Sequence, residues 1–566
     1  MGDNLYTLWC KEPAPNHDLY VEICSTEYGR STNDKTMKKN NVTAKKLRDK
    51  GNELYSKKKY HDAMAYYNQS ISYAENNSEA LALAYANRST CFLNLNLFQE
   101  CLIDIERARI GYPSSQMSKL DNREQKCMDL MNKIGNESHV REPELSFNEN
   151  GMHPGVADCL KIEKNSKFGR HVVTTRDLEI AQTILVEMPF AFKNEPIKPD
   201  HSMQYDPFVD KSRIIQHDRS GDNTFGRCMY CYVECTNLIP CENCAGVLFC
   251  DEVCMKKAYH KNDCQMADSS RKETLGMVLR MLYRTNDAFP CVNELMTTVR
   301  LLLDGNNVNW HQNDDQRNFS LIFQLPTHSG HQWSRNLKLT RTVTEVIYNK
   351  VMRLPDFKGK FTSSTHRRFL QHLILHLFHV AEHAINASEY WRESDDQNLG
   401  TFDVRTFGNG MYPFGCYINH SCTPNVCWYF VDHRLICRVI RPIRKNQQLF
   451  GFYFPSTLCE HIPHQNRGLL LEYHYFFKCK CKLCLNPNWS IFTGKDLSEG
   501  PLYEKAIEPT WMDLNEIRKL TTEELVSYER EAAKFLAKYD RFHPVKDTMM
   551  MQHQLHMLWN TFASRR

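Results

Sequence analysis

The residues best suited to chemistry are cysteines, which occur in two dense groups. The first group combines two Cys-x2-Cys pairs with Cys-x3-Cys and His-x3-Cys. Two closely spaced thiolates can bind one ion without strain, and eight N or S donors suffice for two tetrahedral zinc sites. The eight candidate ligands are Cys228, Cys231, Cys241, Cys244, Cys250, Cys254, His260 and Cys264.

The short spacing between these pairs favours two interleaved sites. One ion would take Cys228, Cys231, Cys250 and Cys254, and the other would take Cys241, Cys244, His260 and Cys264. His260 and Cys264 are four residues apart, so they share one face of a helix. Buried thiols without metal are the alternative, and we favour zinc because all eight positions fit the spacing of zinc ligands.

The second group is Cys479-x-Cys481-x2-Cys484, which is one thiolate short of a closed zinc site. The natural fourth ligand is Cys422, in the stretch Tyr-Ile-Asn-His-Ser-Cys-Thr-Pro-Asn at 417–425. Such a site would tie the polar residues before Cys422 to a segment near the C-terminal end of the sequence.

Composition limits the functional classes. The chain has 566 residues, of which 42% are hydrophobic and 24% charged, which is typical of a globular protein of about three to five domains. No apolar run approaches the ~20 residues of a membrane span, and no secretory signal is evident, so the 23 cysteines should be reduced or metal-bound. The net charge of +4 gives no reason to expect nucleic-acid binding. We expect a monomer that resides in the cytoplasm and nucleus and does not associate with a membrane.

Residues 43–136 have a helical pattern that repeats. Gly51 and Leu54 correspond to Ser89 and Phe92 at an offset of 38 residues, and Pro113 follows the second unit. This pattern resembles tetratricopeptide helical repeats. Residues 1–42 are polar and irregular, and we expect a flexible arm.

The rest of the chain alternates between strand and helix patterns. Strand alternation is evident at 170–192, and residues 425–443 resemble a hairpin. Residues 272–390 and 500–566 have helical patterns, and residues 140–160 resemble a linker.

Several motifs together carry a family resemblance. The cysteine group at 228–264 resembles a MYND finger, and Asn-His-Ser-Cys at 419–422, Gly-Phe-Tyr-Phe-Pro-Ser at 451–456 and the cysteines at 479–484 resemble a SET domain. The chain thus resembles the SET–MYND protein lysine methyltransferases over about residues 43–490, in their tetratricopeptide-bearing subclass. The resemblance implies an α+β multidomain fold with a knot-like crossing beneath the active site.

The resemblance also implies a division of the chain. The expected units are a flexible N-terminal arm (1–42), tetratricopeptide helical repeats (43–136), the first part of the SET domain (155–227), a MYND zinc finger (228–264), a helical SET insert (265–390), the core SET domain (391–456), a zinc-binding post-SET loop (457–490) and short C-terminal helices (491–566).

The family pattern assigns roles to individual residues. Tyr453 matches the catalytic tyrosine, and three zinc ions are implied, two in the finger and one on Cys422, Cys479, Cys481 and Cys484. The residues matched to S-adenosylmethionine binding are Lys167, Arg170, Asn386, Asn419, His420, Tyr453 and Phe477.

These roles imply methyl transfer from S-adenosylmethionine to a lysine of a histone or another protein. The lysine amine, with a pKa near 10.4, must lose its proton, which an apolar channel and a nearby sulfonium favour. A scaffold with little activity, which recruits chaperones or transcriptional repressors, is the alternative. His171 and Gln182, which depart from the SET pattern, favour that alternative.

The helical repeats carry a possible peptide clamp. Chaperone-binding tetratricopeptide domains hold a C-terminal carboxylate with basic and amide residues, and the matching residues here are Arg48, Asn52, Asn87, Lys119 and Arg123. We hypothesise that this module binds the acidic tails of heat-shock chaperones. The alternative is that these residues are only solvated or packed. The MYND resemblance also implies docking of Pro-containing peptides.

Overall fold

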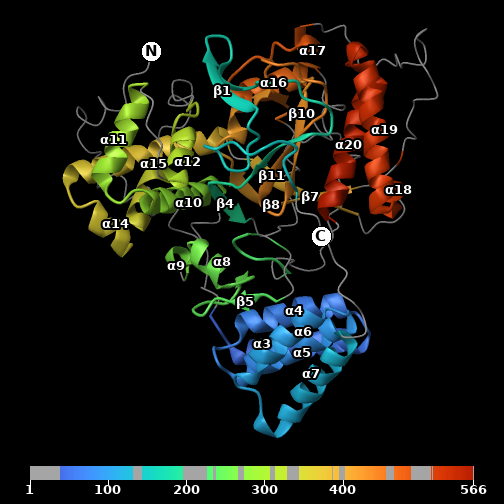
Figure 1. The fold of residues 1–566 in the computed structure, drawn as a ribbon. Coiled ribbons are helices and arrows are strands. Elements are labelled where there is room, and N and C mark those ends of the chain that lie inside the picture. Colours follow the sequence, from blue (N-terminus) through green and yellow to red (C-terminus); the bar gives the residue numbers. More distant parts are fainter. Residues whose placement is uncertain are drawn as a thin grey trace.

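In the computed structural model the chain forms several adjacent parts (Figure 1). It describes residues 38–131, 143–194, 226–231, 233, 237–264, 273–305, 313–327, 343–384, 386–393, 402–453, 464–485, 512 and 514–564. An N-terminal helical module lies at one end, the cysteine-rich finger follows, and the β-rich centre lies between a helical insert and a C-terminal helix pair.

The helical module consists of consecutive helices that pack against their neighbours in sequence. Its helices are α3 (Asn41–Ser56), α4 (Tyr60–Tyr73), α5 (Glu79–Asn94), α6 (Phe98–Arg109) and α7 (Met117–Met131). The side chain of Asn40 accepts the Thr43 amide, and Ser78 accepts the Leu81 amide, so both helix pairs begin at a capped end. The helices predicted within 43–136 are therefore present.

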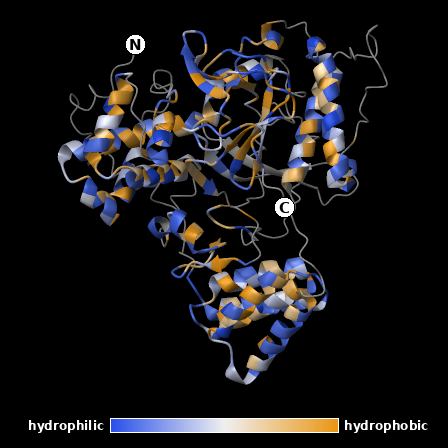
Figure 2. Ribbon diagram, in the orientation of Figure 1, coloured by the Kyte–Doolittle hydropathy of each residue, from blue (hydrophilic) through white to orange (hydrophobic). Residues whose placement is uncertain are grey.

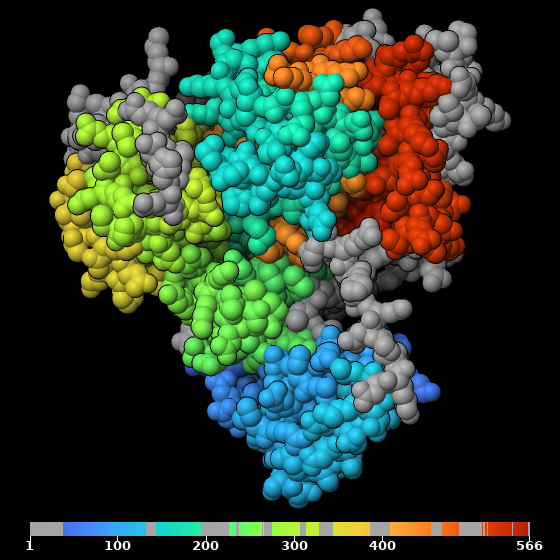
Figure 3. Space-filling model, viewed as in Figure 1, coloured from blue at the N-terminus to red at the C-terminus, as the bar shows by residue number. Residues whose placement is uncertain are grey.

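The finger contains short elements that pack on the helical module. They are β5 (Ile239–Pro240), β6 (Leu248–Phe249), α8 (Glu252–Lys257) and α9 (His260–Asp263). Asn237 donates hydrogen bonds to Asp104 and to the Glu100 carbonyl, while Arg107 donates to the Asn237 carbonyl. Apolar residues of both parts form one cluster, and Figure 3 shows the two in contact.

The β-rich centre is built from small sheets. Strand β3 (Thr183–Glu187) pairs with β11 (Arg434–Val439), which pairs with β10 (Val426–Val431), all antiparallel. The remaining strands are β1 (Leu160–Asn165) with β2 (Gly169–Thr174); β4 (Ala191–Asn194) with β8 (Phe402–Met411) and β7 (Asn386–Glu393); and β9 (Asn419–His420) with β12 (Phe450–Gly451). The predicted hairpin at 425–443 is confirmed.

Helices cover the centre on two sides, and apolar residues alternate with polar ones along them (Figure 2). On one side lie α10 (Glu273–Ala288), α11 (Val292–Leu303), α12 (Asp314–Phe323), α14 (Pro355–Lys360) and α15 (Ser364–Ala384). Near the C-terminal end lie α16 (His464–Tyr475), α17 (Lys482–Leu485), α18 (Leu514–Lys519), α19 (Thr522–Tyr539) and α20 (Lys546–Ser564). Helix α20 packs on β10, and α19 begins at a Thr521–Glu524 capping box.

Three regions differ from expectation. The segment at 140–160, interpreted as a linker, contributes buried Val156, Ala157 and Cys159 to the central core where it is described. The insert helices end at Ala384, and β7 begins at Asn386, earlier than the expected end at 390. The expected loop at 457–490 contains helix α16. Within the described ranges, the structure contains no helix long and apolar enough to cross a bilayer.

Candidate functional site

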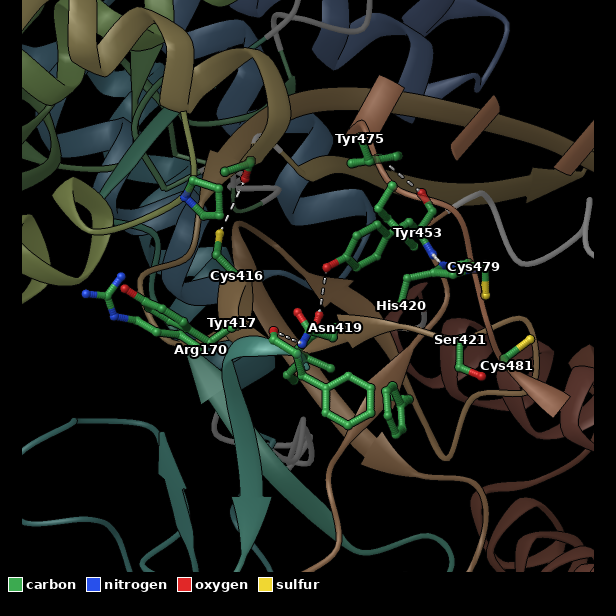
Figure 4. A pocket seen from close by; sticks show the side chains of 18 of the residues that line it. Arg170, Cys416, Tyr417, Asn419, His420, Ser421, Tyr453, Tyr475, Cys479 and Cys481 are labelled. Carbon is green, nitrogen blue, oxygen red and sulfur yellow. Dashed lines mark hydrogen bonds between the residues drawn. The ribbon is translucent and has the colours of Figure 1, made fainter. Parts of the chain in front are cut away.

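Most of the residues predicted to bind the cofactor surround a cavity of about 1170 Å³ (Figure 4). Its walls come from the β1–β2 hairpin, the segment 415–425, Tyr453 and the segment 475–482, with contributions from the helical insert. Parts of the chain more than 300 residues apart therefore meet at one place. A cavity of this size suits a small molecule together with part of a larger partner.

Two short parallel strands bring Asn419 and Tyr453 to the same wall. Strand β9 pairs with β12, with Phe450 opposite Asn419 and Gly451 opposite His420. The Ser421 amide also donates to the Gly451 carbonyl at 2.9 Å. A side chain at Gly451 would overlap the ring of Trp428, so this close approach requires glycine.

The β1–β2 hairpin lies against this wall. The side-chain nitrogen (Nδ2) of Asn419 donates to the Phe168 carbonyl at 3.1 Å, which fixes the hairpin turn over β9. Arg170 donates to the backbone carbonyl and the side-chain oxygen of Gln324, both at 2.8 Å. The Lys167 ammonium lies 4.8 Å from the centre of the Phe168 ring. The predicted Lys167 and Arg170 both line the cavity.

Tyr453 is held on three sides. Its hydroxyl donates to the Ile418 carbonyl at 3.2 Å, and its backbone amide donates to Nδ1 of His420 at 3.1 Å. Its ring lies 4.8 Å from that of Tyr475 and edge-on to Phe477. Burial and the neighbouring Tyr475 raise the pKa of Tyr453, so its hydroxyl stays protonated at neutral pH.

His420 connects the cavity to a cysteine cluster. Its Nε2 lies 3.3 Å from the Cys422 sulfur, while Nδ1 accepts from Tyr453. The His420 ring also packs near Phe477, with ring centres 6.0 Å apart. The position of Tyr453 is therefore coupled through one imidazole to the cluster that contains Cys422.

Three clusters of potential metal ligands are assembled, each with ligand atoms within 4.8 Å of one another. The clusters are Cys228, Cys231, Cys250 and Cys254; Cys241, Cys244, His260 and Cys264; and Cys422, Cys479, Cys481 and Cys484. This grouping agrees with the interleaving predicted from sequence. The Cys231–Cys250 and Cys241–Cys264 sulfur pairs are 3.7 Å apart, and the Cys422–Cys484 pair is 3.6 Å apart.

A buried carboxylate supports the cavity wall from behind. Glu187, at the end of β3, accepts the backbone amides of Phe414 at 2.6 Å and Gly415 at 2.9 Å. These amides begin the turn that leads to Ile418. Burial raises the pKa of Glu187 to about 7, and the two amide hydrogen bonds oppose that rise.

Sequence reasoning missed residues contributed by distant segments. Tyr417 lies in the cavity wall and donates to the Leu321 carbonyl at 2.6 Å. The partly buried Cys416 thiol, whose pKa desolvation raises to about 12, lies 3.4 Å from the Ala384 carbonyl. Gln324 and His383 come from the helical insert, where no local motif marks them. The position of Tyr417 and Cys416 just before Asn419 was the available signal.

Three further residues singled out in the sequence are His171, Gln182 and Asn386. His171 is buried in the hairpin, with Nδ1 3.0 Å from the Gly169 carbonyl, and Gln182 accepts the Glu179 amide. Neither of these residues is among those that line the cavity. Asn386 begins β7, and its side chain lies outside the described part of the structure.

Comparison with known proteins agrees with this geometry. Residues 169–454, half of the chain, match the SET domain family. This range includes both Asn419 and Tyr453.

Individual relatives extend the similarity beyond the SET domain. The chain is 23% identical to the protein-lysine N-methyltransferase SMYD4 of Danio rerio, over 82% of this chain and 67% of the relative. It is 21% identical to the SMYD4 of Mus musculus, over 85% of this chain and 72% of the relative. It is also 21% identical to the histone-lysine N-methyltransferase ASHR1 of Arabidopsis thaliana, over 58% of this chain and 55% of that protein.

Proposed function

The chain belongs to the SET domain family and is a protein-lysine N-methyltransferase, and we propose that the cavity at Asn419 and Tyr453 receives both S-adenosylmethionine and the target lysine. The observation that carries this proposal is the meeting of β9, Tyr453 and the 475–482 segment in one cavity (Figure 4). The residues that these segments bring to the cavity are sufficient for a catalytic role. This favours the enzyme over the scaffold.

The residues present fit the methyl donor chemically. S-Adenosylmethionine supplies a methyl group on a sulfonium, together with an adenine ring, a ribose and an amino acid moiety. Phe477 offers an aromatic surface, Asn419 offers a carboxamide, and Arg170 offers a guanidinium suited to a carboxylate. We assign these contacts to the three residues and include Lys167, His420 and Asn386 as further candidates.

Tyr453 then acts on the lysine amine as a neutral hydroxyl. Because the raised pKa of Tyr453 keeps it protonated, the residue orients the amine through a hydrogen bond and does not serve as the base. Tyr475 packs against Tyr453 and narrows the space beside it. Alignment of the amine by such fixed groups accounts for a large part of the rate enhancement in two-substrate reactions.

Calorimetric titration of S-adenosylmethionine into the metal-loaded protein tests the site. We expect saturable binding that Asn419→Ala weakens, because that variant loses the Phe168 contact and the carboxamide. Tyr453→Phe should retain binding and lose about 100-fold in methyl transfer. Absence of binding by folded wild-type protein would favour the scaffold.

Each cysteine cluster holds one zinc ion in this proposal. A tetrahedral site with Zn–S bonds of about 2.3 Å places its sulfurs about 3.8 Å apart. The observed separations of 3.6 Å and 3.7 Å support this assignment. Elemental analysis of purified protein should find three zinc ions per chain, and a different metal or fewer ions would contradict it.

The helical module recruits a partner in a second part of the proposal. Asn87 donates to the Asn52 carboxamide at 2.7 Å, so these predicted clamp residues lie together. Lys119 is exposed on α7, while Arg123 donates to the Ala86 carbonyl and the Ser89 hydroxyl of α5. The module thus presents amides and cations from three helices, a suitable set for the terminal carboxylate of a chaperone tail.

Fluorescence anisotropy with a labelled acidic chaperone-tail peptide tests the clamp. Lys119→Ala should weaken binding because it removes one cation of the clamp. The Lys119 side chain is exposed, so the substitution should leave the packing of the module unchanged. The same peptide with an amidated C-terminus serves as the control and should bind weakly. Equal binding of the acid and amide forms would refute the clamp. The finger remains a candidate surface for Pro-containing peptides, which the same assay can measure.

A further inference from the structure

The charges around the catalytic cavity are strongly one-sided. Seven lysine and arginine residues line it, and no aspartate or glutamate does so among the described residues. The seven are Lys164, Lys167, Arg170, Arg441, Lys478, Lys480 and Lys482. The net charge of the whole chain is only +4, so this local excess is not a general property of the protein.

The cations lie on two opposing parts of the wall. Lys164, Lys167 and Arg170 belong to the β1–β2 hairpin, whereas Lys478, Lys480 and Lys482 alternate with the cysteines of the C-terminal cluster. Figure 3 shows the hairpin (teal) beside the 475–485 region (orange) at the top of the molecule. A segment that enters between them would face positive charge on both sides.

Internal partners neutralise only part of this charge. Arg441 pairs with Asp540 at 2.6 Å, and Lys478 lies 3.6 Å from Glu472 in an exposed pair. Arg170 is satisfied by the neutral Gln324. Within the described part of the chain, Lys164, Lys167 and Lys480 have no carboxylate within salt-bridge distance.

The metal cluster reduces the excess without removing it. Four thiolates around a divalent ion carry two net negative charges, and the alternating lysines of 478–482 lie beside them. The three hairpin cations lie on β1, on β2 and in the turn between them, far in the sequence from the cysteines that bind this ion. The entrance of the cavity, which lies between the β1–β2 hairpin and the 478–482 segment, therefore remains positive when the cluster holds a metal ion.

On the basis of the proposed methyltransferase function, we propose that the preferred substrate is a lysine flanked by aspartate or glutamate residues. Cavities lined by one sign of charge concentrate partners of the opposite sign and increase their association rates. A target surrounded by lysine and arginine, as in a strongly basic tail, is repelled by the same wall.

The cations also favour the reactive form of the target amine. A lysine entering this cavity meets fixed positive charges, which lower its pKa and favour the neutral amine. The acidic flanks lie outside the narrow part of the cavity and supply attraction there. Selection of the substrate and loss of the proton thus follow from one charge distribution.

The test compares labelled peptides that share a central lysine and differ only in flanking residues, which are acidic, neutral or basic. Fluorescence anisotropy in the presence of S-adenosylhomocysteine measures binding without turnover. We expect the acidic peptide to bind at least about tenfold more tightly than the neutral one at low salt, with the difference shrinking as salt screens it. Equal binding, absent binding of all peptides, or preference for the basic peptide overturns the proposal.

Charge-reversal variants locate the preference. Lys164→Glu/Lys480→Glu reverses one exposed lysine on each side of the entrance and should remove most of the acidic preference. Lys358→Glu/Lys519→Glu makes the same net change at exposed lysines that do not line the cavity, and should keep the preference. If both variants behave alike, the entrance charge does not select the substrate. If the first variant fails to fold, the wild-type peptide comparison still decides.

Two further arms separate this proposal from its alternatives. A short single-stranded oligonucleotide tests whether the cavity binds any polyanion, and competition with the acidic peptide at equal charge would overturn substrate selection. Methyl transfer to the same peptides tests the enzyme itself. Absence of transfer with retained acidic-peptide binding would contradict the methyltransferase alone, whereas transfer without charge preference would contradict the substrate proposal alone.

Discussion

Arg88 of helix α5 and Asp104 of helix α6 form a fully buried ion pair with two hydrogen bonds, at 2.7 Å and 2.9 Å. The same guanidinium donates to the Leu238 carbonyl of the finger at 3.1 Å. Asn237 also donates to the Asp104 carboxylate. The finger therefore completes a charged network inside the helical module.

Removal of one member of this pair should destabilise both parts together. Arg88→Met leaves the buried Asp104 carboxylate without its main partner, which costs about 3–5 kcal/mol. Thermal unfolding followed by circular dichroism should show the loss, and Arg88→Met/Asp104→Leu should recover part of it. Arg109→Ala breaks solvent-accessible pairs with Asp121 and Glu124 and should cost less than about 1 kcal/mol. Similar losses in the two single variants would contradict the role of burial.

The C-terminal metal cluster should be necessary for cofactor binding. Cys481→Ser removes a ligand from the cluster that contains Cys422, whose neighbour His420 holds the Tyr453 backbone. We expect one fewer metal ion per chain and weaker S-adenosylmethionine binding by calorimetry. Cys244→Ser should also lose one ion, yet retain cofactor binding, because the finger does not line the cavity. Unchanged binding in Cys481→Ser would show that the wall stands without the metal.

Stability should depend on pH through Glu187. Its pKa is about 7 in the folded protein against 4.5 for an ordinary glutamate, so the folded state binds more protons between these values. The free energy of unfolding should therefore fall as pH rises from 4.5 to 7, by about 3 kcal/mol at most. Glu187→Gln should flatten this slope in melting temperatures, while the exposed Glu163→Gln should preserve it. An identical slope in Glu187→Gln would assign the titration to another group.

Close packing at Gly451 should make this position intolerant of a methyl group. In Gly451→Ala the new Cβ overlaps the Trp428 ring of β10, and relief of the overlap must displace that ring or shift β12, which pairs with β9. We expect a loss of about 1–3 kcal/mol in stability and a larger loss of activity. Gly468→Ala, within α16, meets no atom within 4 Å and should be neutral or slightly stabilising. Wild-type activity in Gly451→Ala would contradict the strand pairing as a requirement.

The sequence predicted the features that depend on local spacing. The grouping of Cys228 with Cys250 and of Cys241 with Cys264 follows from ligand intervals, because a tetrahedral ion imposes strict distances. The union of Cys422 with Cys479 was predicted by counting donors. Helices with strong periodicity, such as α15 and α19, were also predictable.

Features set by tertiary contacts could not be predicted in the same way. Gln324 and His383 reach the cavity from helices whose sequence pattern reports only which face is buried. The segment at Val156–Cys159 has few strand signals. It becomes core because the Ala157 amide donates to the Ile184 carbonyl of β3 and the Gly155 carbonyl accepts the Val186 amide. Glu187 resembles a polar strand residue until its two amide donors at Phe414 and Gly415 are known.

The residues that line the cavity extend along the chain from Lys164 to Lys482. Synthesis on the ribosome proceeds from the N-terminus, and domains fold as they emerge. The helical module and the finger that docks on it are complete once residue 264 has emerged. The catalytic wall must wait for Tyr475 and the last cysteines. A nascent chain thus completes the helical module and the finger, for which we propose partner binding, long before it can methylate anything, and a chain that stops before the last cysteines would lack the catalytic wall.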